Sequence, residues 1–485
     1  MGAILVATPI LVPLATALLL AAMPSSRQQR AVSVLGGVTL LMTSALLFRS
    51  VREGGTIRLA LGSWPAPFGI ELVADPLSAT LGLVTAVMGA ASLVYLASDA
   101  DTGANGSTRL PLVFAMLAGV GGSFVTGDLF NLYVWFELML VSSLGLLAIG
   151  QTSRHLEATL KYFLLNALGT LLLLIGIGYL YATTGHLNFD ALANALAEQP
   201  ASRSVPFVVT LILALLVKAG AFPLFAWLPG SYPTLPAPIL ALFAGLLTKV
   251  GVYAVLRVLG DVVPGTPTLV FDALGVVAVA TMIAGVLGAA YHWDMRRILA
   301  FHIISQIGYM LLGIALNSRL GHAGTVFYIV HHIIVKANLF LVAGLVFRLT
   351  GSYDLRRCGG LYASRPFAAL LFAIPALSLV GIPPLSGFWA KFLIVHEALA
   401  QGHAMWAVAA LSVGVLTLYS MMKFWFEAFW KNHPEAGWAP TTTATLVPAQ
   451  VAIVSLSLIT VGIGLFPEAL LRLTHDAVAS FERIP

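Results

Sequence analysis

Apolar residues along this chain gather in long runs, and short clusters of polar and turn-forming residues separate one run from the next. A helix that crosses a bilayer needs about 20 predominantly apolar residues, because each residue adds about 1.5 Å of length. The pattern therefore predicts an all-α polytopic membrane protein, a single transmembrane domain over residues 1–485 with about fourteen spanning helices. The predicted spans lie near residues 3–22, 31–48, 76–97, 110–127, 129–150, 157–182, 204–228, 235–258, 268–291, 297–316, 321–348, 366–397, 402–430 and 445–466.

Three shorter stretches lie between or after these spans. Residues 56–75 alternate between polar and apolar positions around the turn-forming segment 62–67, which is typical of a β-hairpin on the membrane surface. Residues 186–199 have the pattern of a short amphipathic helix, and the tail 468–485 is expected to form another.

The composition excludes several classes of protein. Apolar residues make up 59% of the chain, charged residues only 9%, and the mean hydropathy is +0.94. Soluble globular domains carry about 25% charged residues, so a soluble enzyme, a nucleic-acid-binding protein and a disordered chain are excluded. The net charge of +5 is small and comes from arginines in loops. The single cysteine, Cys358, excludes an internal disulfide and a cysteine metal cluster within the chain.

Nucleotide-binding motifs are absent from the sequence. There is no Walker A phosphate loop, and no Gly-rich dinucleotide fingerprint follows a predicted strand, so we expect no direct use of ATP and no cofactor or metal. The first apolar run has no basic residue before it and is long enough to span, so we expect a membrane helix there and no cleavable signal peptide.

Lysine and arginine in the loops predict the orientation, because cytoplasmic loops carry an excess of both. Loops after odd-numbered spans hold more of them than loops after even-numbered spans, for example Arg296, Arg297, Arg356 and Arg357. We therefore expect a multi-pass protein of the bacterial inner (plasma) membrane with both termini outside.

Buried lysines are the feature from which a function can be argued. Five of the seven lysines lie inside apolar spans, whereas the eighteen arginines lie in loops or at helix ends. A charge at the bilayer centre costs about 2.5–3.5 kcal/mol on insertion scales. A lysine can release its proton when it loses contact with water, whereas an arginine keeps its proton almost anywhere. This division predicts a proton path. The five lysines are Lys218, Lys249, Lys336, Lys391 and Lys423.

Glu137 is an acidic residue that also lies inside a predicted apolar span. It lies eight residues after Leu129, so about 12 Å along its helix and near the middle of a hydrocarbon core of about 30 Å. An isolated carboxylate at that depth would take up a proton or find a cation, and a buried lysine on another helix is the best candidate. The alternative is a structural ion pair that only fixes helix packing.

Two predicted spans contain helix breaks next to lysines. Pro223 follows Lys218 by five residues, and Pro383-Pro384 precede Lys391 by seven. Proline removes a backbone hydrogen bond, and broken membrane helices are tolerated where the freed backbone faces protein or a water-filled cavity. A pair of interrupted helices is typical of transporters built from inverted repeats, with sites near the midplane.

The span 321–348 adds histidine to the candidate path. His332 and Lys336 are four residues apart, so both lie on one helix face, and we expect them to form a relay. The alternative for His332 is a hydrogen-bonded core histidine. The tandem His331-His332 does not predict a metal site, because no carboxylate follows at ligand spacing. Candidate polar stepping points on another span are Ser305, Gln306, Tyr309 and, more weakly, His302, and the alternative for them is packing alone.

Other charged residues have simpler interpretations. Lys423 and Glu427 are four residues apart and are expected to pair, as a proton exit or as an ion pair at a helix end. Asp128 at a helix junction is expected to be an N-cap. His396 and Glu397 close the Lys391 helix near the membrane surface.

Several segments together resemble the antiporter-like subunits shared by respiratory complex I, membrane-bound hydrogenases and Mrp-type cation/proton antiporters. The resemblance covers about residues 70–430 and is closest to the D-type subunit of the Mrp-type antiporters. The segments that carry it are 127–138 (GDLFNLYVWFEL), 216–224 (LVKAGAFPL), 236–238 (PAP), 245–253 (GLLTKVGVY), 296–309 (RRILAFHIISQIGY) and 381–392 (GIPPLSGFWAKF). Leu228-Pro229-Gly230 departs from the pattern, since many relatives carry Asp after Leu-Pro, and this puts only a local contact in doubt.

The resemblance implies a fold and a set of roles. The fold would have fourteen helices with two five-helix inverted repeats, over residues 110–260 and 268–430. Glu137 and Lys218 would form a charge pair, Lys249 with His332 and Lys336 the central relay, and Lys391 its end. The resemblance also implies a subunit of a hetero-oligomeric complex, in which sodium exchange could use another subunit.

The sequence therefore predicts a transporter subunit rather than an enzyme: one that moves protons along buried Glu, Lys and His side chains in a multisubunit Na+/H+ antiporter. Two alternatives stay open. One is a proton-pumping membrane subunit of complex I or of an energy-converting hydrogenase, and the other is a structural anchor with inert ion pairs.

Overall fold

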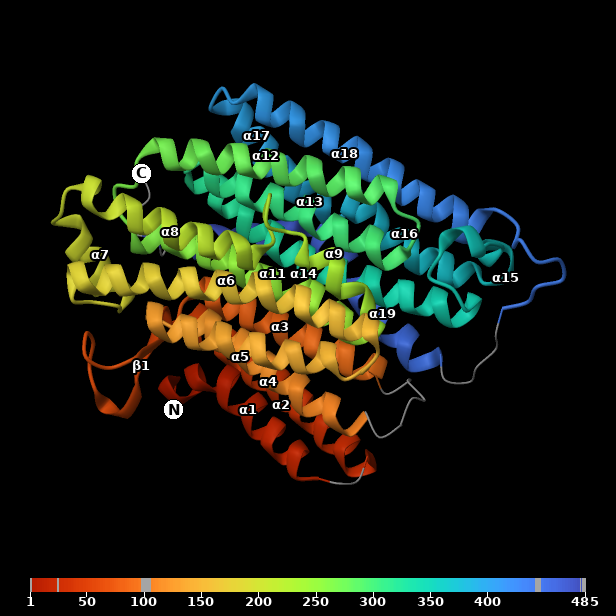
Figure 1. Ribbon diagram of the computed structural model, residues 1–485, viewed down its shortest axis with the longest axis horizontal. Coiled ribbons are helices and arrows are strands. Elements are labelled where there is room, and N and C mark those ends of the chain that lie inside the picture. The colour runs from red at the N-terminus through yellow and green to blue at the C-terminus, as the bar shows by residue number, and fades with distance from the viewer. Residues whose placement is uncertain (1, 24–25, 97–105, 441–445, 480, 482–485) are drawn as a thin grey trace.

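The computed structural model describes residues 2–23, 26–96, 106–440, 446–479 and 481, and these residues form an almost entirely helical bundle (Figure 1). The predicted all-α membrane fold is confirmed at this level. The first ten helices are α1 Gly2–Ala22, α2 Ser26–Gly54, α3 Pro76–Leu96, α4 Gly106–Val125, α5 Leu129–Ala148, α6 Ser153–Thr184, α7 Phe189–Ala197, α8 Ala201–Ala219, α9 Trp227–Ser231 and α10 Ala237–Leu242. The others are α11 Thr248–Arg257, α12 Thr268–Tyr291, α13 Met295–Ala315, α14 Arg319–Thr350, α15 Leu361–Ser364, α16 Pro366–Val380, α17 Ser386–Ala400, α18 Ala404–Trp425, α19 Leu446–Leu465 and α20 Pro467–Ala479.

Short helical segments of other pitch connect some of these. The π-helical segments are η3 Phe243–Leu247, η4 Val258–Val262 and η6 Phe426–Trp430, and the 3-10 turns are η1 Leu61–Ser63, η2 Tyr232–Thr234 and η5 Leu355–Arg357. Together α10, η3, α11 and η4 form one continuous span, Ala237–Val262.

The number of long spanning helices differs from the expectation. Twelve helices of the described residues are long and apolar enough to cross a membrane. The other two predicted spans, 204–228 and 366–397, coincide with shorter apolar helices, Val205–Ala219 and Pro366–Val380, because both spans are interrupted. The structure thus shows twelve long spans, and fourteen crossings remain a prediction.

The predicted hairpin and the two predicted amphipathic helices are present. Strand β1 (Ile57–Ala60) pairs antiparallel with β2 (Glu71–Ala74), with Ile57 opposite Ala74. The short amphipathic helix is α7, and the tail helix is α20, while residues 480 and 482–485 of the expected tail lie outside the described residues. In Figure 1 the hairpin and α7 lie at the same end of the bundle as the start of α1.

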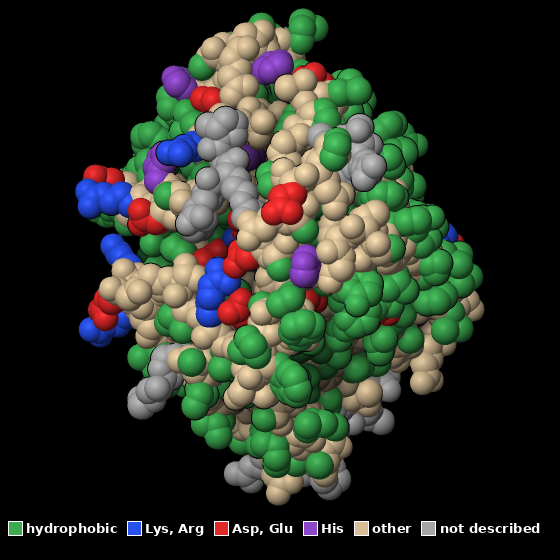
Figure 2. All heavy atoms as spheres, turned by 90° about the vertical axis from the view of Figure 1, so that its left-hand side faces the viewer, with side chains coloured by type: hydrophobic (Ala, Val, Ile, Leu, Met, Phe, Trp, Pro, Cys, Tyr) green, Lys and Arg blue, Asp and Glu red, His purple; other side chains and the backbone are tan. Residues whose placement is uncertain are grey.

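Helix α14 occupies the centre of the bundle. Every residue from Gly321 to Val346 is buried, and α14 packs against α13, α16, α17, α19, α10 and α3 (Figure 1). The outer helices expose leucine and valine instead, for example Leu164 and Leu171 on α6 and Leu411 on α18. Figure 2, which views the hairpin end, shows charged side chains across that end and hydrophobic side chains along much of its margin. Polar groups on α14 are therefore surrounded by protein rather than lipid.

Both predicted helix breaks are present and have the same geometry. Helix α8 ends at Ala219 and is followed by Gly220 (φ 78°), and α16 ends at Val380 and is followed by Gly381 (φ 97°). The amide of Gly220 donates to the carbonyls of Leu216 and Val217, and that of Gly381 donates to the equivalent pair, Leu377 and Ser378. Each helix therefore stops at a glycine in the left-handed region, before the proline that was predicted to break it.

Local geometry also repeats along the chain at a constant offset. Helices α6 and α14 both contain 32 residues, and the shift from Ser153 to Arg319, their first residues, defines what we call the repeat offset. At that same offset their N-caps are Thr152 and Ser318, and each helix ends at a left-handed glycine, Gly185 and Gly351. Two isolated bridges, Asp128 with Asn188 and Asp294 with Asp354, are related by the repeat offset as well.

Candidate functional site

Lys218 lies next to the last residue of α8, beside the first helix break. Its side chain is buried, and its Nζ donates to the backbone carbonyl of Asn166 (3.0 Å) and to Thr170 Oγ1 (2.8 Å), both on α6. The ammonium also stands over the ring of Phe136, 5.7 Å from its centroid. The lysine that the sequence placed in a span is thus held by neutral oxygen atoms at the centre of α6.

The expected charge pair between Glu137 and Lys218 is open in this structure. Glu137 is partly exposed, and none of the ion pairs within 4 Å among the described residues joins it to Lys218. The two charges still lie within electrostatic reach of one another. A cavity of about 20 Å³, lined by Phe136, Asn166, Lys218 and Tyr162 among others, has room for one water molecule.

Lys249 lies within the continuous span Ala237–Val262 and is fully buried. Its Nζ donates to the carbonyl of Ala244 in η3 and to Thr248 Oγ1 (3.2 Å). Gly251 lets this helix approach the first break closely, because a Cβ there would lie only 2.9 Å from the carbonyl carbon of Lys218. The helices of Lys218 and Lys249 therefore touch at the depth of both lysines.

His332 and Lys336 lie one turn apart on α14, and both are fully buried. The two ring nitrogens of His332 and the Nζ of Lys336 have no hydrogen-bond partner among the described residues. Lys249 is within electrostatic reach of both side chains. Buried polar groups without partners cost about 1–3 kcal/mol each, so a cluster of them indicates a role other than packing.

The polar stepping points lie around this cluster on α13 and α14. Tyr328 on α14 donates its hydroxyl to Gln306, and its ring stacks on Tyr309 with centroids 5.5 Å apart. His302 binds Ser420 of α18 and lies within electrostatic reach of Lys336 and Lys391. Further buried atoms without a partner among the described residues are His302 Nδ1, Ser305 Oγ, Gln306 Nε2 and His331 Nε2.

Lys391 lies on α17, just after the second break. Its Nζ donates to the carbonyl of Val380 (2.8 Å), the last residue of α16, and stands 5.0 Å from the ring centroid of Tyr309. His331 Nδ1 lies 2.8 Å from Ser386 Oγ at the start of α17. A lysine thus binds a carbonyl that the break has freed, as the sequence argument for broken helices requires.

The pairing expected between Lys423 and Glu427 is wrong. Lys423 Nζ donates to the carbonyls of Ala290 and His292 (2.7 Å each), and Glu427 pairs with Lys431 instead. The reason is that α12 ends beside Lys423, where its last carbonyls have no helical partner.

The remaining predicted residues have structural roles. Asp128 is the N-cap of α5 and accepts from the amide of Asn131 (2.8 Å), as predicted, and burial raises the pKa of its carboxyl. His396 is exposed, and Glu397 accepts from Gln401 (2.8 Å). The described residues contain no group of three His, Cys, Asp or Glu side chains that could hold a metal.

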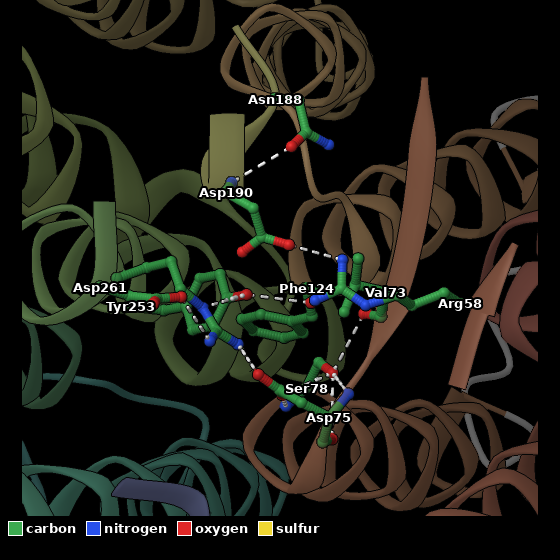
Figure 3. A network of polar contacts seen from close by, with 10 residues as sticks. Arg58, Val73, Asp75, Ser78, Phe124, Asn188, Asp190, Tyr253 and Asp261 are labelled. Carbon is green, nitrogen blue, oxygen red and sulfur yellow. Dashed lines mark hydrogen bonds and ion pairs between the residues drawn. The ribbon is translucent and has the colours of Figure 1, made fainter. Parts of the chain in front are cut away.

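A polar network at the hairpin end was missed by the sequence analysis (Figure 3). Arg257 forms an ion pair with Asp75 (2.5 Å), and both side chains are 7% exposed. Arg257 also contacts Asp261 (3.5 Å) and donates to the Tyr253 hydroxyl (3.3 Å), which in turn donates to the carbonyl of Phe124 (3.0 Å).

This network borders a cavity of about 530 Å³ near the hairpin, where Arg58 pairs with Asp190 (2.7 Å). The i, i+4 spacing of Arg257 and Asp261 was a signal in the sequence, and at the repeat offset the same spacing recurs at Lys423 and Glu427. Asp75 could not be linked to Arg257 in this way, because the two lie far apart in the chain, before α3 and at the end of α11.

Comparisons with known proteins give consistent results. The family model described as "NADH:quinone oxidoreductase/Mrp antiporter, TM" matches residues 126–417. The chain is 42% identical over 436 residues to the D-type subunit of a Na(+)/H(+) antiporter from Alkalihalophilus pseudofirmus, covering 89% of this chain and 88% of that protein. It is 36% identical over 458 residues to the protein of the same description from Bacillus subtilis, covering 94% and 93%.

Solved structures are similar over nearly the whole chain. A chain of the Mrp complex from Dietzia sp. DQ12-45-1b superimposes with a TM-score of 0.89 at 31% identity, covering 99% of this chain and 97% of that one. A chain of the membrane-bound sulfane sulfur reductase, an archaeal respiratory membrane complex, gives 0.90 at 25% identity, with coverage of 99% and 98%. A chain of respiratory complex I from Thermus thermophilus gives 0.86 at 25% identity, with coverage of 99% and 99%.

Proposed function

This chain belongs to the NADH:quinone oxidoreductase/Mrp antiporter family, and we propose that it is the proton-translocating subunit of a multisubunit Na+/H+ antiporter. Its relatives at 42% and 36% identity are described as D-type subunits of a Na(+)/H(+) antiporter, which supports an assembly with other membrane subunits. The function is that of a secondary transporter subunit in a bacterial plasma membrane, not that of an enzyme.

The proposed proton route runs from Lys218 at the end of α8 to Lys391 on α17. Glu137 biases Lys218: when the pair closes, the lysine keeps its proton, and when it opens, the proton moves towards Lys249. From there it passes His332 and Lys336 and leaves through Lys391. The observation that carries this proposal is the group of buried protonatable atoms on α14 that have no partner among the described residues, with Lys249 in electrostatic reach.

We also propose that the fold has fourteen membrane crossings and two inverted five-helix repeats, over residues 110–260 and 268–430. The identical hydrogen bonding at Gly220 and Gly381 supports this, as do the equal lengths and caps of α6 and α14. The excess of Lys and Arg in odd-numbered loops supports an orientation with both termini outside. Labelling of single cysteines placed next to Gly2 and Ala479 in a Cys358→Ser background, from outside intact cells, tests this orientation.

A second candidate function is a proton-pumping subunit of a redox-driven complex. The similarity to chains of the sulfane sulfur reductase and of complex I, at TM-scores of 0.90 and 0.86, favours it on fold alone. The higher sequence identity to the antiporter subunits favours the first proposal. Neighbouring genes distinguish the two: small hydrophobic subunits without redox proteins fit an antiporter, and iron–sulfur or nickel–iron subunits fit a redox-driven pump.

The test is Na+-dependent proton flux in inverted vesicles that carry the whole complex. Lys249→Ala is expected to lower the flux at least a hundredfold, within the range by which positioned acid–base groups act. The matched control is Lys161→Ala, because Lys161 is exposed and pairs only with Glu157 among the described residues. Full flux in Lys249→Ala at normal assembly would contradict the proton route, and it would favour the structural anchor.

A further inference from the structure

We propose that the Thr170 hydroxyl, together with the backbone carbonyl of Asn166, is a second docking position for the Lys218 ammonium, which competes with Glu137. Thr170 is then a positioning residue that sets how often the Lys218–Glu137 pair opens. The inference rests on the proposed function, since it assigns a step to the same proton route.

The hydrogen bonds around Thr170 fix the direction in which its hydroxyl points. Thr170 Oγ1 donates to the carbonyl of Asn166 (2.7 Å), so its own proton is occupied and its lone pairs are free to accept. Lys218 Nζ donates to this oxygen at 2.8 Å and to the Asn166 carbonyl at 3.0 Å. Thr170 and Asn166 are each only 4% exposed. The two acceptor oxygens are therefore already in place and shielded from water. They bind the ammonium without contributing a negative charge.

The surroundings give the lysine two places to bind. Glu137 lies within electrostatic reach but forms no ion pair with Lys218 among the described residues. The cavity of about 20 Å³ lies against Lys218, Asn166 and Phe136, the residue before Glu137. The cavity has room for about one water molecule and is lined on the α5 side by Phe136, Met139 and Leu140, so the Lys218 ammonium can turn towards α5. An ammonium that exchanges a carboxylate for neutral oxygens gives up its proton more readily, which makes the α6 position the releasing one.

The repeated geometry points to the same turn of the helix independently. At the repeat offset, Asn166 and Thr170 of α6 correspond to His332 and Lys336 of α14. Tyr162 and Tyr328 correspond as well, and each donates or accepts a hydroxyl hydrogen bond in the interior. In one half this turn carries protonatable side chains, and in the other it offers acceptors to a lysine from the broken helix. The turn is thus placed on the route in both halves.

The experiment compares Thr170→Val with Thr170→Ser in vesicles that carry the whole complex. Valine keeps the shape and removes the hydroxyl, so the maximal rate of Na+-dependent proton flux should fall about tenfold at an unchanged Na+ concentration for half-maximal rate. Serine restores the hydroxyl and should keep the rate within about twofold of wild type. The control is Thr85→Val on α3, a buried threonine with the same type of back-bond (to the Leu81 carbonyl, 2.8 Å) and no lysine partner among the described residues.

The outcomes separate this inference from the proposed function. Loss in Thr170→Val with rescue in Thr170→Ser supports the docking position. Equal loss in both at normal assembly, or full flux in Thr170→Val while Lys218→Ala is inactive, overturns it and leaves the proton route intact. Full flux in Lys218→Ala would overturn the proposed function itself. If Thr170→Val does not assemble, Thr170→Ala, which adds no bulk, takes its place against Thr170→Ser.

Discussion

The two halves of this molecule share a backbone plan and differ in the chemistry placed on it. In each half a 32-residue helix passes a helix that breaks at a left-handed glycine: α6 beside α8 and Gly220, and α14 beside α16 and Gly381. In the first half the middle of the long helix offers neutral acceptors to Lys218. In the second it carries His332 and Lys336, both without a partner among the described residues.

The comparison shows that the same backbone arrangement carries two different sets of side chains at the equivalent helix turn. The breaks free backbone carbonyls. The buried turn of α6 holds Lys218 beside the first break, and the equivalent turn of α14 lies within electrostatic reach of Lys249. In the proposed route, the side chains at two positions of that turn decide whether it binds a lysine or passes a proton on. The backbone alone does not determine it.

The largest effect should come from converting the α14 turn into the α6 turn. The double variant His332→Asn, Lys336→Thr copies Asn166 and Thr170 and removes both protonatable groups. Na+-dependent proton flux should fall at least a hundredfold, the range in which positioned acid–base groups act. Assembly should be retained, since both replacements are neutral and remove buried polar atoms that have no hydrogen-bond partner among the described residues. Lys161→Thr, an exposed site, is the control, and flux above a tenth of wild type in the double variant would break the comparison.

The next largest difference should be in stability. It should separate the ion pair Arg257–Asp75, near the end of the first half, from the pair Lys431–Glu427, near the end of the second. Asp75→Asn leaves buried Arg257 with Asp261, at 3.5 Å, as its remaining carboxylate among the described residues. We expect a loss of about 2–3 kcal/mol, since a fully orphaned charge costs about 3–5 kcal/mol. Glu427→Gln affects a partly exposed pair with Lys431 and should cost less than about 1 kcal/mol. Thermal unfolding of the purified complex measures both, and equal losses would contradict the difference in burial.

Replacing the glycine at either helix break by alanine should destabilise the protein less. Alanine at Gly220 or Gly381 is forced into the left-handed region, at a cost of roughly 1–2 kcal/mol. The Cβ at Gly381 would also lie 3.0 Å from Lys391 Cδ, whereas at Gly220 the nearest atom is Leu228 Cδ1 at 3.5 Å. Gly381→Ala should therefore also reduce flux per assembled complex, and Gly220→Ala should not. Gly178→Ala in the C-terminal third of α6, with nothing within 4 Å, is the control for the thermal measurement.

The smallest effect concerns the caps after the two long helices, Asn188 and Asp354. The hydrogen bond from Arg356 lowers the pKa of the Asp354 carboxyl, so its contribution is present above the usual value near 4 and is lost as the pH falls through the lowered value. The hydrogen-exchange protection factors of the segment 352–358, which are corrected for the pH dependence of intrinsic exchange, should fall at acidic pH in wild type and not in Asp354→Asn. The segment 186–192 in an Asp190→Asn background, which keeps the uncharged cap Asn188 and removes the carboxylate that pairs with Arg58, is the internal control. A step of equal size in both segments would contradict this assignment.

Much of the fold could be predicted from local sequence. The long apolar runs and the alternation in the hairpin depend on neighbouring residues, and so does the placement of the two breaks. The lysines inside the spans were found because a charge in hydrocarbon is costly wherever the rest of the fold lies. The sequence predicted two more long spans than the described residues form, because each interrupted segment appears in the sequence as one apolar run.

What could not be predicted depends on distant partners. The position of Lys218 is set by Thr170, 48 residues earlier, and Lys423 binds carbonyls at the end of α12, far earlier in the chain. The pairing of Arg257 with Asp75 likewise joins two distant segments. The repeat offset is also hard to detect in the sequence, because different residue types form the equivalent N-caps. Thr152 corresponds to Ser318, and Asn188 corresponds to Asp354.

The measurement that tests the account most directly is Na+-driven proton flux by whole complexes that lack one end of the route, Lys218→Ala in the first half or Lys391→Ala in the second, at equal assembly. If both halves serve one route, each variant should lose at least a hundredfold in rate. Full flux in either variant would contradict the account, because one half would then move protons without the other.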